Sequence, residues 1–533
     1  MQENDLKIIK ETGFNLVLLP HYPHDSAVLD AADRLGLLVW AELPLVREIS
    51  TSPKYADIAR EMFRELIRQQ YNHPSIIIWC YMNEIFLRPL NEPGYVVKTV
   101  QLAQSLESIA RTEDPYRYTA ISANRPYDGS DVYNASGLMQ IPKIAAWHMY
   151  FGWYYGDFKD FGLFLDAQHR RFPRQNIFVS EYGADYDVRL HSLNPLIGDG
   201  TAEWARAFHE SYVEQIEARP YLAGSGVWAQ FEFGSEARGD SHPHLNTKGI
   251  YTFDRRPKDI VYFYQAKFSN KPVVYIVARD WAERRSTADP GNKSGTSAVY
   301  PITVYSNLPQ VELFINGRSF GEKRLEKFGK VIWEVSLTDG LNKIEARGKS
   351  GGKDFSDRTA IRMIIRPEPL TAEFLEKHGL LINVGSGTQL TDAEGNVWEA
   401  DQPFQSNGWG FIGGKPRRTT QNIRNTPDDP LYQTFRQGIF AYRFDIPDGK
   451  YEVEIKFTEA NTEKSVERVF SVTANGSKLI EEFNLSKESG LLNAVSKSFK
   501  LQVKGGKGLS LDFAALSGET VLSAIRLRRL PQR

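Results

Sequence analysis

Residues 75–84 read SIIIWCYMNE, a run that is almost wholly apolar and ends in an amide and a carboxylate. A strand that is apolar on both faces is typical of a parallel sheet covered by helices. Similar runs recur through residues 1–270 and alternate with helical patterns, which predicts βα units around a parallel sheet. The other six runs are FNLVLL (14–19), LLVWA (37–41), RYTAI (117–121), KIAAW (143–147), NIFVS (176–180) and SGVWAQ (225–230).

The helical patterns between these runs carry start and stop signals. Asp25 can cap a helix that ends before Gly36, and the Ser-Pro pair at 52–53 opens an amphipathic run over 54–71. Seven strands count toward an eight-stranded (β/α) barrel, whose usual size is about 250 residues. The chain begins inside a helical pattern, DLKIIKETG (5–13), so we expect the first barrel strand to be missing.

Beyond the barrel pattern the helical period disappears. Short strands such as QVELFING and VIWEVSL, with Asn-Gly and Asp-Gly turns, predict hairpins of a β-sandwich. A further strand-rich stretch contains YEVEIKF, KSFKLQV and SAIRLRR. The predicted fold class is therefore multidomain: a (β/α)8-type TIM barrel over 1–270, lacking its first strand, followed by two all-β sandwich domains over 271–367 and 378–533.

Composition excludes several classes of protein. The 533 residues carry 65 Lys and Arg against 66 Asp and Glu, and this balance argues against a protein built to grip nucleic acid or an anionic membrane. No apolar stretch reaches the roughly 18 residues that a membrane span needs. The single cysteine, Cys80, excludes an internal disulfide framework and any multi-cysteine zinc site. We predict no cofactor and no metal.

Three acidic residues end a predicted strand: Glu42, Glu84 and Glu181. Active sites of barrel folds gather at the carboxyl ends of the strands. Two carboxylates that converge there suit glycoside hydrolysis, one as general acid and the other as nucleophile or base. The alternative is that these acids only cap the helices that follow.

The context of these acids resembles glycoside hydrolase family 2, which contains β-galactosidases, β-glucuronidases and β-mannosidases. The stretch NHPSIIIW (72–79), followed by Met-Asn-Glu at 82–84, resembles the acid/base segment of that family, and SEYGA (180–184) resembles its nucleophile segment. The resemblance covers about 1–270 in order. Its other parts are GFN (13–15), PHYP (20–23), LLVWAE (37–42), GVW (226–228), NTKG (246–249) and DR (254–255).

The resemblance implies roles for four residues. Glu181 would attack the anomeric carbon, and Glu84 would protonate the leaving oxygen and then activate water, as in a retaining enzyme whose carboxyls lie about 5–5.5 Å apart. We expect repulsion from ionised Glu181 to keep Glu84 protonated in the resting enzyme. Asn83 would hydrogen-bond the sugar 2-hydroxyl, and Tyr150 matches a tyrosine near the nucleophile.

Four further residues are candidates for substrate binding. His21 follows the first visible strand and could instead be a buttressing histidine, and Glu42 ends the second. Trp228 offers an aromatic face to a pyranose, with a core role as the alternative. His148 stands where many relatives carry asparagine, which leaves its role open.

Asn246 and Lys248 bear on the choice of sugar. In β-glucuronidases an Asn-x-Lys pair at this place grips the uronate carboxylate, but relatives that act on neutral sugars carry a similar run. We favour a retaining exo-β-glycosidase of β-galactosidase type acting on complex glycans. The alternatives are a β-glucuronidase, or an inactive, truncated barrel that serves as a carbohydrate-binding or scaffold protein.

The C-terminal module resembles a malectin-type carbohydrate-binding domain, through LINVGSG (381–387), WEAD (398–401), GIFAYRF (438–444) and GKYEV (449–453). The middle module resembles the immunoglobulin-like sandwiches that follow this barrel. The expected ligand is an oligosaccharide or polysaccharide side chain. The expected protein partner is a second copy or the missing N-terminal segment, which should restore activity when supplied in trans. The sequence leaves the compartment open, and the resemblance suggests a periplasmic or secreted bacterial protein.

Overall fold

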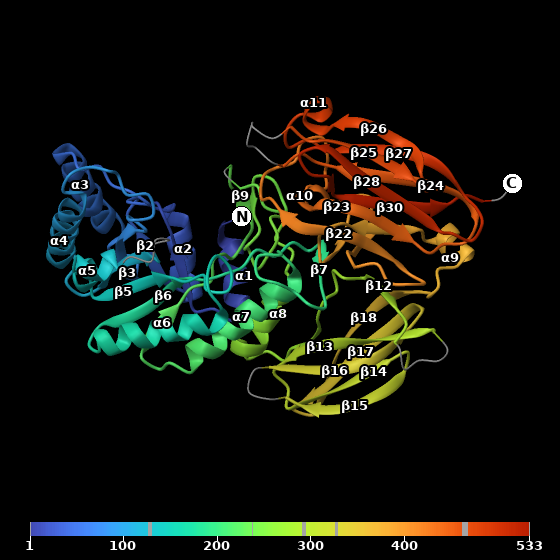
Figure 1. Cartoon of the computed structure of the whole chain (residues 1–533). Helices are drawn as coiled ribbons and strands as arrows, with labels where there is room; N and C mark the ends of the chain where they lie inside the picture. Colours follow the sequence, from blue (N-terminus) through green and yellow to red (C-terminus); the bar gives the residue numbers. More distant parts are fainter. Residues whose placement is uncertain are drawn as a thin grey trace. The chain divides into compact units, whose positions relative to one another are not determined.

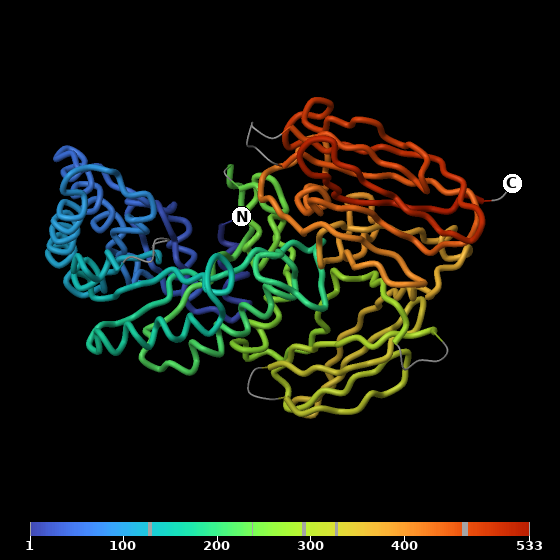
Figure 2. The backbone as a smooth tube through the Cα atoms, in the orientation of Figure 1, coloured from blue at the N-terminus to red at the C-terminus, as the bar shows by residue number. Residues whose placement is uncertain are grey.

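The computed structural model describes residues 2–125, 131–236, 238–289, 295–325, 329–460 and 467–531. The chain folds into two compact units, whose segments can be followed by colour in Figure 2. The barrel unit comprises residues 1–184, 207–231 and 248–272, and the sandwich unit comprises residues 185–206, 232–247 and 273–533. None of the helices within the described ranges is long and apolar enough to cross a membrane.

The barrel unit is built on one sheet of seven strands, with helices packed around it (Figure 1). The strands pair in chain order and every pairing is parallel, beginning with Leu16 opposite Leu38. Trp40, Ile78 and Phe178 belong to the buried cluster on these strands. The strands are β1 (Leu16–Leu19), β2 (Leu38–Glu42), β3 (Ile76–Asn83), β4 (Tyr118–Asn124), β5 (Ile144–His148), β6 (Asn176–Glu181) and β8 (Leu222–Ser225).

The helices begin and end where the sequence signals predict. Asp25 accepts a hydrogen bond from the backbone N–H of Ala27, and Gly36 ends the same helix in the left-handed conformation that glycine favours. The helices are α1 (Gln2–Thr12), α2 (Ser26–Leu35), α3 (Pro53–Gln70), α4 (Tyr95–Glu113), α5 (Val132–Ala135), α6 (Phe158–Arg171), α7 (Ala202–Glu217) and α8 (Asp259–Phe268), with a 3-10 turn at Leu138–Gln140.

The last barrel strand differs from the prediction. The strand covers Leu222–Ser225, and the expected run 225–230 follows it as irregular backbone. Gly226 lies so close to β1 that a Cβ there would come within 2.9 Å of Leu18, and its N–H donates to the carbonyl of Val179. The apolar side chains of this run therefore do not follow a strand. Among the described residues, β1 and β8 form the two edges of the sheet.

The sandwich unit contains four larger sheets. Two of them follow the barrel: a three-stranded sheet and a five-stranded sheet, whose long strands give the alternating burial that a sandwich requires. The first is formed by β11 (Val274–Ile276), β13 (Ser297–Ser306) and β16 (Lys330–Thr338). The second is formed by β12 (Glu283–Thr287), β18 (Lys353–Arg366), β17 (Gly340–Ser350), β14 (Gln310–Ile315) and β15 (Arg318–Arg324).

The C-terminal sheets have seven and six strands and enclose a large apolar core. The first is formed by β27 (Val495–Val503), β24 (Gly449–Phe457), β30 (Ala524–Arg529), β19 (Leu380–Asn383), β21 (Val397–Ala400), β20 (Gln389–Thr391) and β7 (Leu190–His191). The second is formed by β22 (Trp409–Arg418), β23 (Thr434–Phe444), β28 (Leu509–Ser517), β25 (Val469–Ala474), β26 (Ser477–Asn484) and β29 (Val521–Leu522). This part of the chain also contains the short helices α9 (Ala372–Lys377), α10 (Pro430–Gln433) and α11 (Leu485–Ser489).

One strand of this sandwich comes from the segment that follows β6. Strand β7 pairs with β20, and Leu190 packs in a buried cluster with Leu390 and Trp398. A small hairpin of β9 (Phe233–Gly234) and β10 (Leu245–Asn246) belongs to the same unit. The multidomain class of barrel followed by β-sandwiches is confirmed, and two stretches from within the barrel sequence are built into the sandwich unit.

Candidate active site

Two carboxylates lie together at the carboxyl ends of the barrel strands. Glu84 directly follows β3, and Glu181 is the last residue of β6. One oxygen of each carboxylate and a ring nitrogen of His148 all lie within 4.8 Å of one another. This separation is close to that of carboxyl pairs that work by double displacement, about 5–5.5 Å, and well below the roughly 6.5–9.5 Å of pairs that admit an attacking water molecule between them.

His148 bridges the two carboxylates. It ends β5, opposite Glu181 in the parallel pairing, and its side chain is only 2% exposed. Its Nδ1 lies 2.9 Å from Oε1 of Glu84 and 3.2 Å from Oε2 of Glu181. The structure thus brings His148 to the centre of the site and not to its rim.

The charges of these three groups are strongly coupled. Burial alone would lower the pKa of His148, but the negative charges of Glu181 and Glu84 outweigh it and raise the pKa to about 9. Burial raises the pKa of Glu181 to about 7, against the lowering effect of His148. For Glu84, burial is outweighed by the hydrogen bond and charge of His148, and the pKa is lowered. The expectation that repulsion from Glu181 keeps Glu84 protonated is therefore wrong, because a cation lies between them.

Tyr150 orients the second carboxylate. Its hydroxyl donates to Oε2 of Glu181 over 2.8 Å, and the backbone N–H of Met149 donates to the carbonyl of Glu181 over the same distance. Burial and the charge of Glu181 hold the pKa of the Tyr150 hydroxyl well above its usual value, so it remains a donor. Glu181 is fixed at both its side chain and its backbone.

Glu42 is an anchor for its neighbours. Its carboxylate accepts from Nε1 of Trp40 at 2.9 Å, from the backbone N–H of His21 at 2.7 Å and from Nδ2 of Asn83 at 3.3 Å. Its side chain is 2% exposed. These bonds occupy both oxygens of Glu42 and fix the positions of His21 and Asn83. Asn83 directly precedes Glu84 in the chain.

Two residues of this group have strained backbones. Glu84 has φ of 51° and His21 has φ of 76°, the left-handed region that side chains other than glycine rarely adopt. Such strain persists where surrounding bonds enforce it, and it concentrates at functional sites. The backbone N–H of Glu84 donates to the carbonyl of Ser122 at 2.8 Å, which holds this conformation at the end of β3.

Trp228 lies beside His21, with ring centroids 5.4 Å apart. The indole is half-buried, so part of its face is open. Its backbone N–H donates to the carbonyl of Tyr182, the residue after Glu181. The structure brings Trp228 close to the nucleophile segment, as its place in the sequence motif predicts.

Lys248 is buried against aromatic rings of the loop that carries Tyr150. Its Nζ lies 4.8 Å from the ring centre of Tyr154 and 5.3 Å from that of Trp153, and the residue is 1% exposed. Tyr154 in turn contacts the ring of Tyr150 at 5.1 Å. The sequence analysis missed Trp153 and Tyr154 as functional residues. The signal for them was the aromatic density of HMYFGWYY (148–155).

Asn246 falls in the other unit. It lies on β10, paired with Phe233, and is buried within the sandwich unit. Lys248 belongs to the barrel unit. The boundary between the units thus passes through the Asn-x-Lys run.

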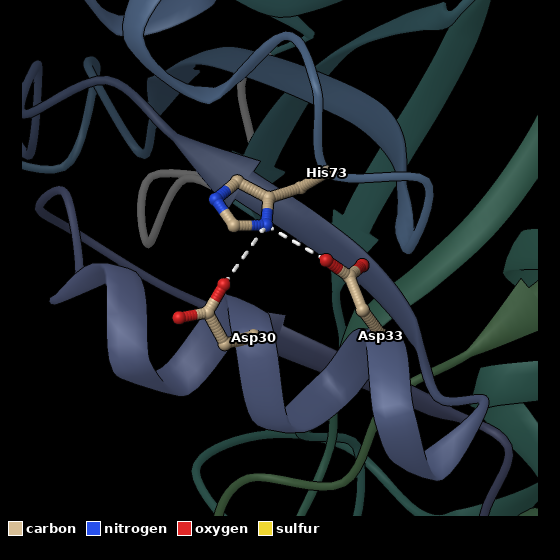
Figure 3. Close-up of side chains that lie close together, drawn as sticks. All are labelled: Asp30, Asp33 and His73. Atoms are coloured by element: carbon tan, nitrogen blue, oxygen red, sulfur yellow. Dashed lines mark hydrogen bonds and ion pairs between the residues drawn. The ribbon is translucent and has the colours of Figure 1, made fainter.

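Two groups of described residues have the ligand types and spacing that a metal ion could use: Glu84 with His148 and Glu181, and Asp30 with Asp33 and His73. In the second group (Figure 3), Nδ1 of His73 lies 2.8 Å from Asp33 and 3.9 Å from Asp30. The other oxygen of Asp33 accepts from the backbone N–H of Ser75 at 2.9 Å. Asp33 therefore fastens α2 to the start of β3, and this second group is a structural brace.

We expect Asp33→Ala to lower the free energy of unfolding by about 1–3 kcal/mol at neutral pH, because it leaves two partly buried donors, on His73 and Ser75, without their acceptor. Burial raises the pKa of Asp33, but hydrogen bonds from Ser75 and His73 outweigh it and lower the pKa below the ordinary 3.8. The stabilisation is therefore present above that value and is lost as the pH falls through the lowered pKa. Urea unfolding at several pH values measures it. Asp30→Ala, the exposed neighbour, is the control and should cost less than about 0.5 kcal/mol.

A parallel βα sheet that presents two closely spaced carboxylates at the carboxyl ends of its strands is the arrangement that retaining glycoside hydrolases use. The chain belongs to glycosyl hydrolase family 2: residues 1–271 match the TIM barrel domain of that family. Residues 378–526 match the malectin domain, and residues 297–356 match a domain of unknown function. The predicted membership of this family and the malectin-like module are both confirmed.

Three relatives illustrate the similarity. A solved structure of Bacteroides uniformis beta-glucuronidase 2, covalently bound to cyclophellitol-6-carboxylate aziridine, is 36% identical, with a TM-score of 0.93 over 100% of this chain and 63% of that one. A Bacteroides fragilis beta-glucuronidase is 32% identical over 67% of this chain and 50% of its own length. A Bacteroides ovatus beta-galactosidase is 23% identical over 77% of this chain and 52% of its own. The chain spans about half the length of these two curated relatives.

Proposed function

We propose that the chain carries the catalytic machinery of a retaining exo-β-glucuronidase. Glu181 attacks the anomeric carbon and forms a glycosyl ester while Glu84 protonates the departing oxygen. Glu84 then takes a proton from the incoming water, which releases the sugar with its configuration retained. The short separation of the carboxylates supports this double displacement over direct attack by water.

The other site residues have parts in this proposal. Tyr150 donates a hydrogen bond to Oε2 of Glu181 and stabilises this oxygen while the other oxygen of the carboxylate bonds to the sugar. Asn83, held by Glu42, has an Oδ1 without a hydrogen-bond partner among the described residues, which suits a sugar hydroxyl as donor. His21 and Trp228 form a paired ring surface for the apolar face of the sugar.

Lys248 is the observation that carries the choice of a uronic acid. A lysine with so little exposure brings a positive charge into a region walled by Trp153 and Tyr154, and a carboxylate on the substrate would compensate that charge. The loop that forms this wall also supplies Tyr150 to Glu181, so the cation and the nucleophile are linked through adjoining rings. The relative that is covalently bound to cyclophellitol-6-carboxylate aziridine supports the same choice.

A β-galactosidase is the second candidate. The sequence alone favoured it, and one of the relatives carries that name. The beta-glucuronidase names of the relatives with 32% and 36% identity weigh toward the uronic acid.

A panel of aryl β-glycosides tests the proposal. Glucuronide, galactoside, mannoside and glucoside with the same leaving group are compared on the purified chain. We expect kcat/KM for the glucuronide to exceed the others by at least about 30-fold, the factor that corresponds to 2 kcal/mol of charge recognition. A galactoside hydrolysed faster than the glucuronide would establish the second candidate instead.

A further inference from the structure

Glu84, His148 and Glu181 lie together at the centre of the site, and they have more atoms that can bind a proton than protons to fill them. Nδ1 of His148 faces carboxylate oxygens of both Glu84 and Glu181 at hydrogen-bonding distance or close to it. A ring nitrogen that faces two carboxylates is favourable only when it carries a hydrogen, since its lone pair would repel both. The two flanking carboxylates also favour a second hydrogen, on Nε2, because they raise the pKa of His148 to about 9, and above the pKa of Glu181, about 7, both carboxylates are ionised.

The charges around His148 also favour its protonated form. Glu42 adds a third negative charge that acts on His148, and Arg47 is a nearby cation, which acts on Glu84. Tyr150 is neutral because the pKa of its hydroxyl is raised. Glu84, Glu181 and Glu42 thus outnumber the cations around the imidazole, and the surroundings favour its protonated form.

This resting state is not the one that the first step of the reaction needs. A double displacement begins with Glu84 protonated and Glu181 ionised. The proton that Glu84 lacks lies 2.9 Å away, on the nitrogen to which it is hydrogen-bonded. No proton has to enter the buried site from solvent if this one moves.

We propose that His148 stores the catalytic proton and passes it to Glu84 at the start of each turnover. This inference rests on the proposed roles of Glu84 and Glu181. In this scheme His148 contacts neither the sugar nor the leaving group. It is a positioning residue, because it acts on the substrate only through the proton that it passes to Glu84.

The proton count balances over a cycle. The N–H bond at Nδ1 breaks, its electron pair stays on the imidazole, which keeps its hydrogen on Nε2, and an O–H bond forms on Glu84. Glu84 gives this proton to the leaving oxygen as the glycosidic bond breaks and an oxygen of Glu181 bonds to the anomeric carbon. Glu84 next accepts a proton from water, whose oxygen displaces Glu181. That proton returns to Nδ1, and the resting state is restored.

The first test reads the proton directly and uses the unmodified chain. In enzyme labelled with ¹⁵N-histidine and free of substrate, nitrogen NMR should show His148 doubly protonated at neutral pH and losing its proton near pH 9. His209 is an internal control in the same spectra, since burial lowers its pKa to about 3 and keeps it neutral. A neutral His148 at pH 7 would overturn the proposal.

The second test uses His148→Asn and the pH dependence of kcat/KM. In the parent enzyme the alkaline limb should follow His148. In the variant only Glu84 can hold the catalytic proton. The alkaline limb of kcat/KM for alkyl glycosides should therefore shift to lower pH by at least about one unit. Dinitrophenyl glycosides, which need no protonation, should show no such movement. An unmoved limb with a uniform loss of rate would mean that His148 only shapes the site.

These outcomes separate this inference from the proposed function. If the chain hydrolyses no glycoside while His148 still titrates near pH 9, the proposed function fails and the stored proton remains. If glycosides are hydrolysed by a chain whose His148 is neutral, the proposed function stands and the inference fails.

Discussion

Glu181→Gln is expected to reduce turnover of every β-glycoside by more than about 10⁴-fold, because the amide that replaces the carboxylate cannot form the glycosyl ester. Its oxygen would still accept from Tyr150, so the fold should be unchanged. Single-turnover assays with the glucuronide and with the neutral glycosides measure the loss. Glu107→Gln, which alters a buried acid on α4 away from the strand ends, is the matched control and should keep most of the activity.

Glu84→Ala should behave differently from the nucleophile variant. In this variant kcat/KM for glycosides with poor leaving groups should fall about 10²- to 10⁴-fold. Dinitrophenyl glycosides should form the glycosyl ester almost as fast as with the unsubstituted chain. The anomeric configuration of the first product, followed by NMR, provides an independent check. An inverted product would exclude Glu181 as the nucleophile.

Lys248→Met is expected to cost about 2–4 kcal/mol in transition-state binding of a glucuronide and to leave neutral glycosides nearly unaffected, because the substrate carboxylate loses its partner in a buried place. The substitution keeps most of the side-chain length against Trp153 and Tyr154. The ratio of kcat/KM for glucuronide and galactoside is therefore the decisive measurement.

One control separates charge recognition from damage to the loop. Lys267→Met removes a largely buried lysine of α8 that pairs with Glu217, and it should change kcat/KM for neither the glucuronide nor the galactoside. Losses of equal size on glucuronide and galactoside for Lys248→Met would show a structural lysine, held by the aromatic rings for stability alone.

The positions of the barrel strands followed from the sequence because a strand buried on both faces is an uninterrupted apolar run. SIIIWCYMN and NIFVSE show this directly, and the acid that ends each run is placed at the catalytic edge by chain direction alone. Local signals also sufficed at α2, where Asp25 and Gly36 act within their own turns. The last strand was placed wrongly because the close packing of Gly226 against Leu18 is a contact between residues far apart in sequence.

Tertiary structure alone decided the chemistry between the two acids. The sequence determined that Glu84 and Glu181 end parallel strands, since this depends on local apolar pattern and direction. It could not determine that His148 would lie between them, because that depends on the registers of β3, β5 and β6 and on distances across the sheet. The same holds for Lys248. Its burial beside Trp153 and Tyr154 depends on the folding of a loop that lies far from it in the sequence. Burial and charge coupling depend on the whole arrangement of neighbours, and no single stretch of sequence contains that arrangement.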